Sequence, residues 1–205
     1  MLDQFGVWQG PVSNQALFWE PFHGSKVLNF SSAVHYLVSG LGIASHWARY
    51  YPGAEPAPSQ VEGLHGFFWL RRQDQIHWAM IRELLGKTQF DSFHLHLAVD
   101  PGSPPAKIPS PEDMQRYGIT TSTWFEDRRE LTALLDRANV YFAPRMEEGI
   151  GQSFLEAMAR AKCVVAPNQG TMNEYIVDGL NGLLFDHQAR RALDFSDVDR
   201  MGRNA

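Results

Sequence analysis

Two carboxylates, Glu148 and Glu156, flank a glycine-containing segment and could bind hydroxyl groups of a ligand. This segment, Gly149–Ser153, leads into an amphipathic pattern that predicts a helix. The free amides and dipole of a helix N-terminus favour an anion, and glycines let the backbone approach it closely. Carboxylates repel a nearby phosphate. A ligand that binds here should therefore also offer hydroxyls, whose hydrogen bonds to the carboxylates offset that repulsion. The pattern therefore predicts a ligand with a phosphate and several hydroxyls, such as a nucleotide-sugar. The alternative is a tight strand-to-helix turn.

A second group of candidates consists of two adjacent arginines, Arg71 and Arg72. They follow Gly66–Leu70 directly, and this apolar run predicts a buried strand. Guanidinium groups bind phosphates through two parallel hydrogen bonds, so the pair could hold a diphosphate. Exposed arginines are also common at strand ends, and that structural role is the alternative.

Glu156 has an alternative role as a helix cap. The order Ser153-Phe-Leu-Glu156 matches a capping box, in which the glutamate folds back onto the amide of the serine. Thr171-Met-Asn-Glu174 repeats this pattern, and we interpret Glu174 as a cap. For Glu156 we favour ligand binding because of its spacing from Glu148.

Short apolar runs alternate with helical patterns along the chain, which is typical of a parallel α/β sheet. Helical spacing of apolar residues recurs over residues 76–85, 131–138 and 154–161. Right-handed crossovers would give a Rossmann-like, doubly wound sheet with its ligand at the carboxyl ends of the strands. The six expected strands are Gly66–Leu70, Phe93–Val99, Gly118–Thr121, Asn139–Ala143, Cys163–Ala166 and Gly182–Phe185.

A proline-rich segment, Pro52–Ser59, is the predicted domain boundary. Before it, residues 27–31 and 33–40 predict one strand followed by one helix, whereas residues 1–24 show no assignable pattern. Pro101–Pro111 is expected to be a stiff surface loop. Residues 1–58, 59–187 and 188–205 are therefore predicted as a remnant domain with its linker, a ligand-binding domain and a poorly ordered charged tail.

Several motifs occur in order after the predicted strand at Asn139–Ala143. They are Glu-x7-Glu (Glu148 to Glu156) closing on Leu-Glu-Ala-Met-Ala, then Val-Val-Ala-Pro, Gly170-Thr-Met-Asn-Glu-Tyr and Asp178-Gly-Leu-Asn-Gly-Leu-Leu-Phe185. In this order and spacing they resemble the retaining glycosyltransferases of group 1 (family 4). The resemblance is clearest over residues 66–186 and extends weakly to residue 25.

The resemblance implies a GT-B fold, with this chain covering the C-terminal, donor-binding half and a fragment of the N-terminal domain. It implies that Glu148 contacts the transferred sugar and Glu156 the ribose. The family's diphosphate clamp is an arginine and a lysine; the lysine is not at its usual place here, so Arg72 is expected to supply both charges. No metal or cofactor is expected. The expected site comprises Glu148 and Arg72 as catalytic residues, and Arg71, Gly149, Ile150, Gly151, Gln152, Ser153 and Glu156 as donor-binding residues.

Composition excludes several other classes of protein. A net charge of −5 argues against a general nucleic-acid or anionic-membrane surface. The single cysteine, Cys163, excludes an internal disulfide, and its apolar neighbours predict a buried strand residue. The eight histidines form no metal motif, and His94 and His96 are expected to be structural. No apolar run is long enough to span a membrane and no secretion signal is evident, so we expect a cytoplasmic location, including the inner face of a membrane.

Three functions remain open at this point. The first is a glycosyltransferase, or its donor-binding half, that uses a nucleotide-diphospho-sugar and retains anomeric configuration. The second is a non-catalytic nucleotide-sugar-binding module that needs a partner chain to supply the N-terminal domain. The third, ranked last, is a GT-B sugar-nucleotide epimerase. The sequence does not identify the base, the sugar, the acceptor or the oligomeric state.

Overall fold

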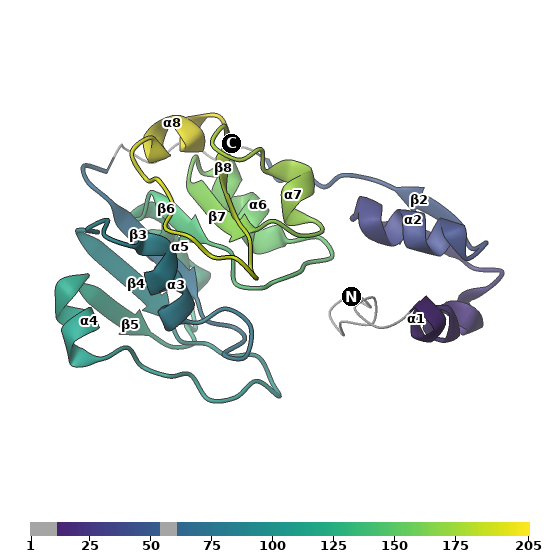
Figure 1. The fold of residues 1–205 in the computed structure, drawn as a ribbon, viewed down its shortest axis with the longest axis horizontal. Helices are drawn as coiled ribbons and strands as arrows, with labels where there is room; N and C mark the ends of the chain where they lie inside the picture. The colour runs from purple at the N-terminus through teal and green to yellow at the C-terminus, as the bar shows by residue number, and fades with distance from the viewer. Residues whose placement is uncertain (1–11, 54–60) are drawn as a thin grey trace.

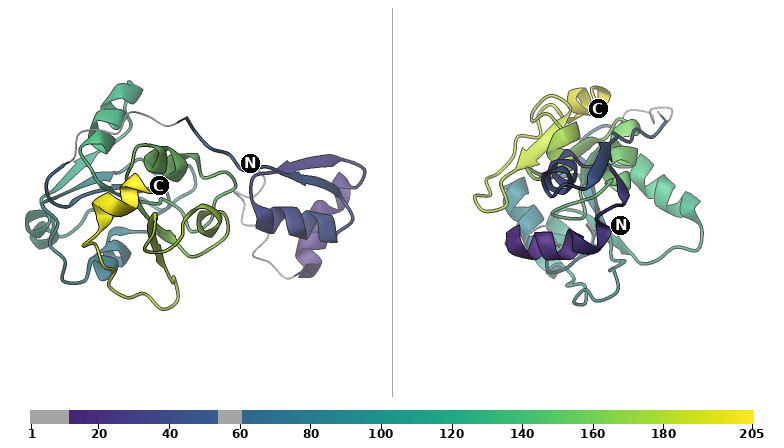
Figure 2. Two further views of the ribbon diagram at one scale, coloured as in Figure 1. Left: turned by 90° about the horizontal axis from the view of Figure 1, so that it is seen from above. Right: turned by 90° about the vertical axis from the view of Figure 1, so that its right-hand side faces the viewer.

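The computed structural model describes residues 12–53 and 61–205, and these form a small unit joined to a larger one (Figure 1). The small unit lies to one side of the larger, and an extended segment after β2 leads back from it (Figure 2). Its two strands are parallel and are connected through α2. Its elements are α1 (Val12–Trp19), the 3-10 helix η3 (Glu20–Phe22), β1 (Lys26–Asn29), α2 (Ser32–Gly40) and β2 (Ala44–Trp47).

The larger unit is built on a six-stranded sheet with the order β5-β4-β3-β6-β7-β8. Every neighbouring pair in it is parallel, which confirms the predicted α/β class and Rossmann-like sheet. The order reverses between β3 and β6, where such sheets bind their ligands. The strands are β3 (His65–Trp69), β4 (Ser92–His96), β5 (Ile119–Ser122), β6 (Val140–Phe142), β7 (Cys163–Pro167) and β8 (Gly182–Phe185).

Helices cover both faces of this sheet because successive strand residues point in opposite directions. Phe67 belongs to one buried cluster, together with residues of α6 and α7. Its neighbour Phe68 belongs to the other cluster, together with residues of α3 and α8. The helices are α3 (Trp78–Leu85), α4 (Pro111–Arg116), α5 (Arg128–Asp136), α6 (Gln152–Ala159), α7 (Met172–Tyr175) and α8 (Val198–Arg203).

Helices α2, α3, α5 and α6 confirm the four predicted helices, whereas α1, η3, β2, α4 and α8 were not predicted. Helix α4 begins at Pro111, the last residue of the predicted loop. The Ser110 side chain caps it by accepting from the Asp113 amide at 3.2 Å. The proposed boundary segment lies largely within residues 54–60, outside the described residues, so the domain division stays a prediction.

The C-terminal segment packs against the sheet, so the expectation of a poorly ordered tail was wrong. Phe195 is 2% exposed, and its ring lies edge-on to that of Phe90 with centroids 5.1 Å apart. Val198 and Met201 of α8 are buried in the same cluster. The sequence prediction failed because these few apolar residues are separated by charged ones, which obscured their common face.

The expected capping role of Glu174 was also wrong. Its carboxylate accepts from the Ser32 amide at 2.9 Å and from the Ser31 hydroxyl at 3.1 Å. Glu174 therefore satisfies the N-terminus of α2 in the small unit instead of its own helix. The next residue, Tyr175, accepts from the Tyr50 amide at 3.0 Å through its hydroxyl. These contacts connect the small unit to the larger one.

The histidines of β4 are structural, as expected. His94 hydrogen-bonds the hydroxyls of Thr120 and Ser122, both at 2.8 Å. His96 contacts the Ser122 hydroxyl at 2.9 Å and stacks on Phe125 with ring centroids 4.9 Å apart. Burial lowers the pKa of His96 to about 4.

We expect the folded state to lose stability in mild acid because of His96. Between its ordinary pKa of 6.5 and its folded pKa of about 4, the unfolded chain binds the proton more tightly. The free energy of unfolding should therefore fall by about 1.4 kcal/mol per pH unit as the pH drops through this window. Urea unfolding at pH 7, 6 and 5 would measure this slope. His96→Asn should have a shallower slope, and identical slopes would contradict the prediction.

Candidate functional site

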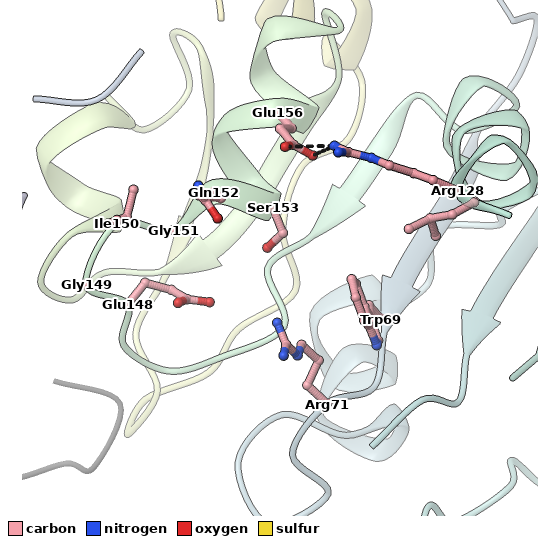
Figure 3. Close-up of a pocket in the computed structure, with 11 residues that line it drawn as sticks. Trp69, Arg71, Arg128, Glu148, Gly149, Ile150, Gly151, Gln152, Ser153 and Glu156 are labelled. Atoms are coloured by element: carbon pink, nitrogen blue, oxygen red, sulfur yellow. Dashed lines mark hydrogen bonds and ion pairs between the residues drawn. The ribbon is translucent and has the colours of Figure 1, made fainter. Parts of the chain in front are cut away.

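A pocket of about 550 Å³ lies where β3, the loop after β6 and the N-terminus of α6 meet (Figure 3). This volume is within the usual range for small-molecule sites. Eight of the nine residues expected in the site line it. The lining residues are Trp69, Arg71, Arg128, Leu131, Glu148, Gly149, Ile150, Gly151, Gln152, Ser153 and Glu156.

The start of α6 presents backbone amides to this pocket. Gly151 is the N-cap residue and adopts a left-handed conformation, with φ 72° and ψ 40°. Because α6 begins at Gln152, Ser153 is its second residue and cannot form the proposed capping box. The Ser153 hydroxyl instead hydrogen-bonds Tyr141, whose pKa is raised by burial. The first amides of α6 therefore have no side-chain cap, and they can serve an anion.

Glu156 points away from its helix N-terminus and pairs with Arg128, the first residue of α5 (Figure 3). One terminal nitrogen of Arg128 contacts the two carboxylate oxygens at 3.0 and 3.1 Å. Both side chains are substantially exposed, 78% for Arg128 and 42% for Glu156. Exposed ion pairs are weak, so the carboxylate can exchange this partner for ligand hydroxyls at little cost.

The backbone of Glu148 is fixed by a residue outside the pocket lining. The buried Thr171 side chain donates a hydrogen bond to the Glu148 carbonyl oxygen. Thr171 itself has a positive φ of 74°, which a non-glycine residue rarely adopts. In Figure 3 the Glu148 side chain extends into the pocket, toward the face that carries Arg71. This arrangement holds a carboxylate opposite a cation across the pocket.

The two adjacent arginines diverge. Arg71 lines the pocket, lies over the Trp69 ring at 4.8 Å from its centroid, and pairs with Asp100 at 2.7 Å. Arg72 does not line this pocket, and it pairs with Asp74 at 2.7 Å. Neighbouring residues at a strand end point in different directions, so one arginine of the pair turns away. The structure thus gives no support for the catalytic role that we expected of Arg72.

Sequence reasoning missed three lining residues, namely Trp69, Arg128 and Leu131. Trp69 ends β3, and its position immediately before the arginines could have identified it. Arg128 and Leu131 are three residues apart on α5, so they share one face of that helix. Nothing in the sequence pattern connects this face with α6, because 28 residues separate Arg128 from Glu156.

The lining of the pocket combines cationic, anionic and aromatic groups. Two guanidinium groups and the amides of α6 can bind phosphate oxygens, while two carboxylates can accept from hydroxyls. Residues 12–53 and 61–205 contain no cluster of three or more His, Cys, Asp or Glu that could hold a metal. The pocket is therefore suited to an anionic, hydroxyl-rich ligand.

Cys163 is buried in β7, as predicted, and burial raises the pKa of its thiol to about 12.

Part of the chain is similar to a known family. Residues 114–194 match the family described as glycosyl transferases group 1. The matched segment makes up less than half of the chain. It contains Glu148, α6 and Glu156, and thus most of the pocket. A 75-residue stretch is also 36% identical to alpha-maltose-1-phosphate synthase from Mycobacterium tuberculosis, covering 35% of this chain and 19% of that protein.

Solved glycosyltransferases share the fold of this chain. HepE from Anabaena, in complex with UDP and glucose, matches with a TM-score of 0.68 and 14% identity over 96% of this chain and 62% of that chain. Sucrose-phosphate synthase from Thermosynechococcus elongatus matches with a TM-score of 0.59 and 16% identity over 94% and 50%. These similarities show a GT-B fold, of which this chain is a partial, C-terminal-like domain. The chain spans less than two thirds of each of these relatives.

The part of the chain that the structure describes contains no helix long and apolar enough to cross a membrane. Its longest helices, α2 and α5, have only nine residues each. A helix needs about 20 apolar residues to span the hydrocarbon core of a bilayer.

Proposed function

We propose that the pocket binds a nucleotide-diphospho-sugar and that this chain is the donor-binding half of a glycosyltransferase that retains anomeric configuration. The observation that carries the proposal is the convergence of the uncapped α6 N-terminus, Arg71, Glu148 and Glu156 on one cavity. The group 1 family match over residues 114–194 supports the reaction class. No resident cofactor is needed for this chemistry, because the sugar is already activated by its bond to the diphosphate, which is the leaving group.

The diphosphate is assigned to the α6 N-terminus and Arg71. When the bond between the anomeric carbon and the β-phosphate oxygen breaks, negative charge accumulates on that phosphate. Backbone amides and a guanidinium placed there stabilise the leaving group more strongly as its charge grows, which lowers the barrier. Gly149 and Gly151 lack a Cβ and so let the backbone approach the phosphate closely.

The two carboxylates are assigned to the two sugars of the donor. Glu156 is proposed to accept hydrogen bonds from the ribose hydroxyls, and Glu148 from the transferred sugar. Retention is proposed to follow from attack of the acceptor oxygen on the face that the phosphate leaves, with the acceptor proton passing to the departing phosphate oxygen. This front-face route needs no covalent bond between the sugar and the protein.

Calorimetric titration of the purified chain with UDP, GDP and ADP would test the donor site. We expect saturable binding of one of the three, and about tenfold weaker binding in Glu156→Ala, since a hydrogen bond to a charged group is lost. Glu83→Ala is a matched control, because Glu83 pairs with Arg190 outside the pocket. Folded wild-type protein that binds none of the nucleotides would refute the proposal. Binding without transfer in the presence of candidate acceptors would favour the non-catalytic module.

A further inference from the structure

Asp100 connects the phosphate-facing arginine to the loop that carries Glu148, although it does not line the pocket. It lies four residues after the end of β4, and its side chain is 12% exposed. Its backbone amide donates to the Arg71 carbonyl oxygen at 2.8 Å. Its carboxylate accepts from two guanidinium groups, those of Arg71 and Arg145.

The contact with Arg71 fixes the orientation of that side chain. Nε and one terminal nitrogen of Arg71 donate to the same oxygen of Asp100, at 2.9 and 2.7 Å. The other fixed neighbour of this guanidinium is the Trp69 ring, at 4.8 Å from its centroid. A guanidinium has five N–H donors, and these contacts occupy only one edge of it. The remaining donors are available on the pocket side, where Arg71 is part of the lining.

The second carboxylate oxygen holds Arg145. A terminal nitrogen of Arg145 donates to it at 2.5 Å, and the Arg145 side chain is only 12% exposed. Arg145 precedes Glu148 by three residues, at the start of the loop that leads to α6. One carboxylate therefore links the ends of β3, β4 and β6.

The charges of this group favour an anion. Two guanidinium groups around one carboxylate leave a net charge of +1 beside the pocket. The residual positive charge lies on groups that the protein has already oriented, so little reorganisation is needed when a phosphate binds. An unheld arginine would lose more side-chain entropy on binding.

We propose that Asp100 is a positioning residue for the diphosphate. It orients Arg71 toward the β-phosphate and holds Arg145, and through it the Glu148 loop, at the same phosphate. This inference rests on the proposed function of the pocket and assigns a residue outside its lining to that function.

The test compares a diphosphate with a monophosphate. UDP and UMP are titrated into wild type, Asp100→Asn and Asp100→Glu; if the first titration selects another base, GDP and GMP or ADP and AMP replace them. Asp100→Asn should weaken UDP binding roughly tenfold and UMP binding by less than about twofold, because only the charge-assisted contact to the β-phosphate is disturbed. Asp100→Glu, which keeps the carboxylate, should restore part of the loss.

Asp74→Asn is the matched control, because it removes a carboxylate from Arg72 outside the pocket and should leave both affinities unchanged. Thermal unfolding followed by circular dichroism establishes that each variant is folded, and Asp100→Glu carries the test if Asp100→Asn is not. An unchanged ratio of UDP to UMP affinity in a folded Asp100 variant would overturn this inference alone. Wild type that binds no nucleotide would overturn the proposed function as well.

Discussion

Replacing Gly151 with alanine is expected to destabilise the protein strongly and to abolish nucleotide binding. A Cβ at this position would lie 1.9 Å from the Cε1 atom of the buried Phe154 ring. The left-handed backbone, with φ of 72°, adds strain for any residue that has a Cβ. Strain of about 1–2 kcal/mol and overpacking of about 1–3 kcal/mol together predict a loss of roughly 2–5 kcal/mol in the free energy of unfolding. Relaxation of this clash would also move the amides of α6.

Urea unfolding of wild type and Gly151→Ala measures this loss, and nucleotide titration measures the effect on the site. Gly179→Ala is a closely matched control, because its φ is 70° but no atom lies within 4 Å of the added Cβ. It should lose only the strain contribution, about 1–2 kcal/mol, and should bind nucleotide normally. Equal stability of the two variants would show that Phe154 can move aside and would contradict the packing argument.

Replacing Glu148 with alanine is expected to lower turnover about 100-fold while changing nucleotide affinity by less than about threefold. The physical reason is that Glu148 is proposed to hold the transferred sugar, whereas the α6 amides, Arg71 and Glu156 hold the nucleotide diphosphate. Loss of the carboxylate leaves the sugar poorly placed over the departing phosphate. Release of nucleoside diphosphate from the donor, measured in a longer, active form of the protein that also contains the N-terminal half, gives kcat, and calorimetry with the free nucleotide measures affinity.

Glu147→Ala is the control for this prediction, because Glu147 is the adjacent carboxylate and does not line the pocket. Its turnover should stay within about twofold of wild type, since a substitution outside the site usually has a small effect. A Glu148→Ala variant that keeps wild-type turnover would remove the proposed role of this residue. A variant that loses nucleotide binding and turnover equally would instead place Glu148 at the nucleotide.

The sequence determined the local elements and the loop at the centre of the site. The buried strands were predictable because they are short apolar runs bounded by turn residues, as in Cys163–Ala166 and Gly182–Phe185. The α6 N-terminus was predictable because a strand, a glycine turn and an amphipathic pattern follow one another without interruption. All these signals lie within a few residues, where periodicity and turn chemistry are informative.

The tertiary structure alone decided the partners of the charged residues. Arg71 meets Asp100 across 29 residues, Arg128 meets Glu156 across 28, and Ser32 meets Glu174 across 142. A capping box predicts a local bond for a glutamate, but Glu156 and Glu174 each have a distant partner instead. Side-chain hydrogen bonds and ion pairs depend on which strand ends and helix termini the sheet brings together. Hydrophobic periodicity specifies which face of an element is buried, but not which element packs against it.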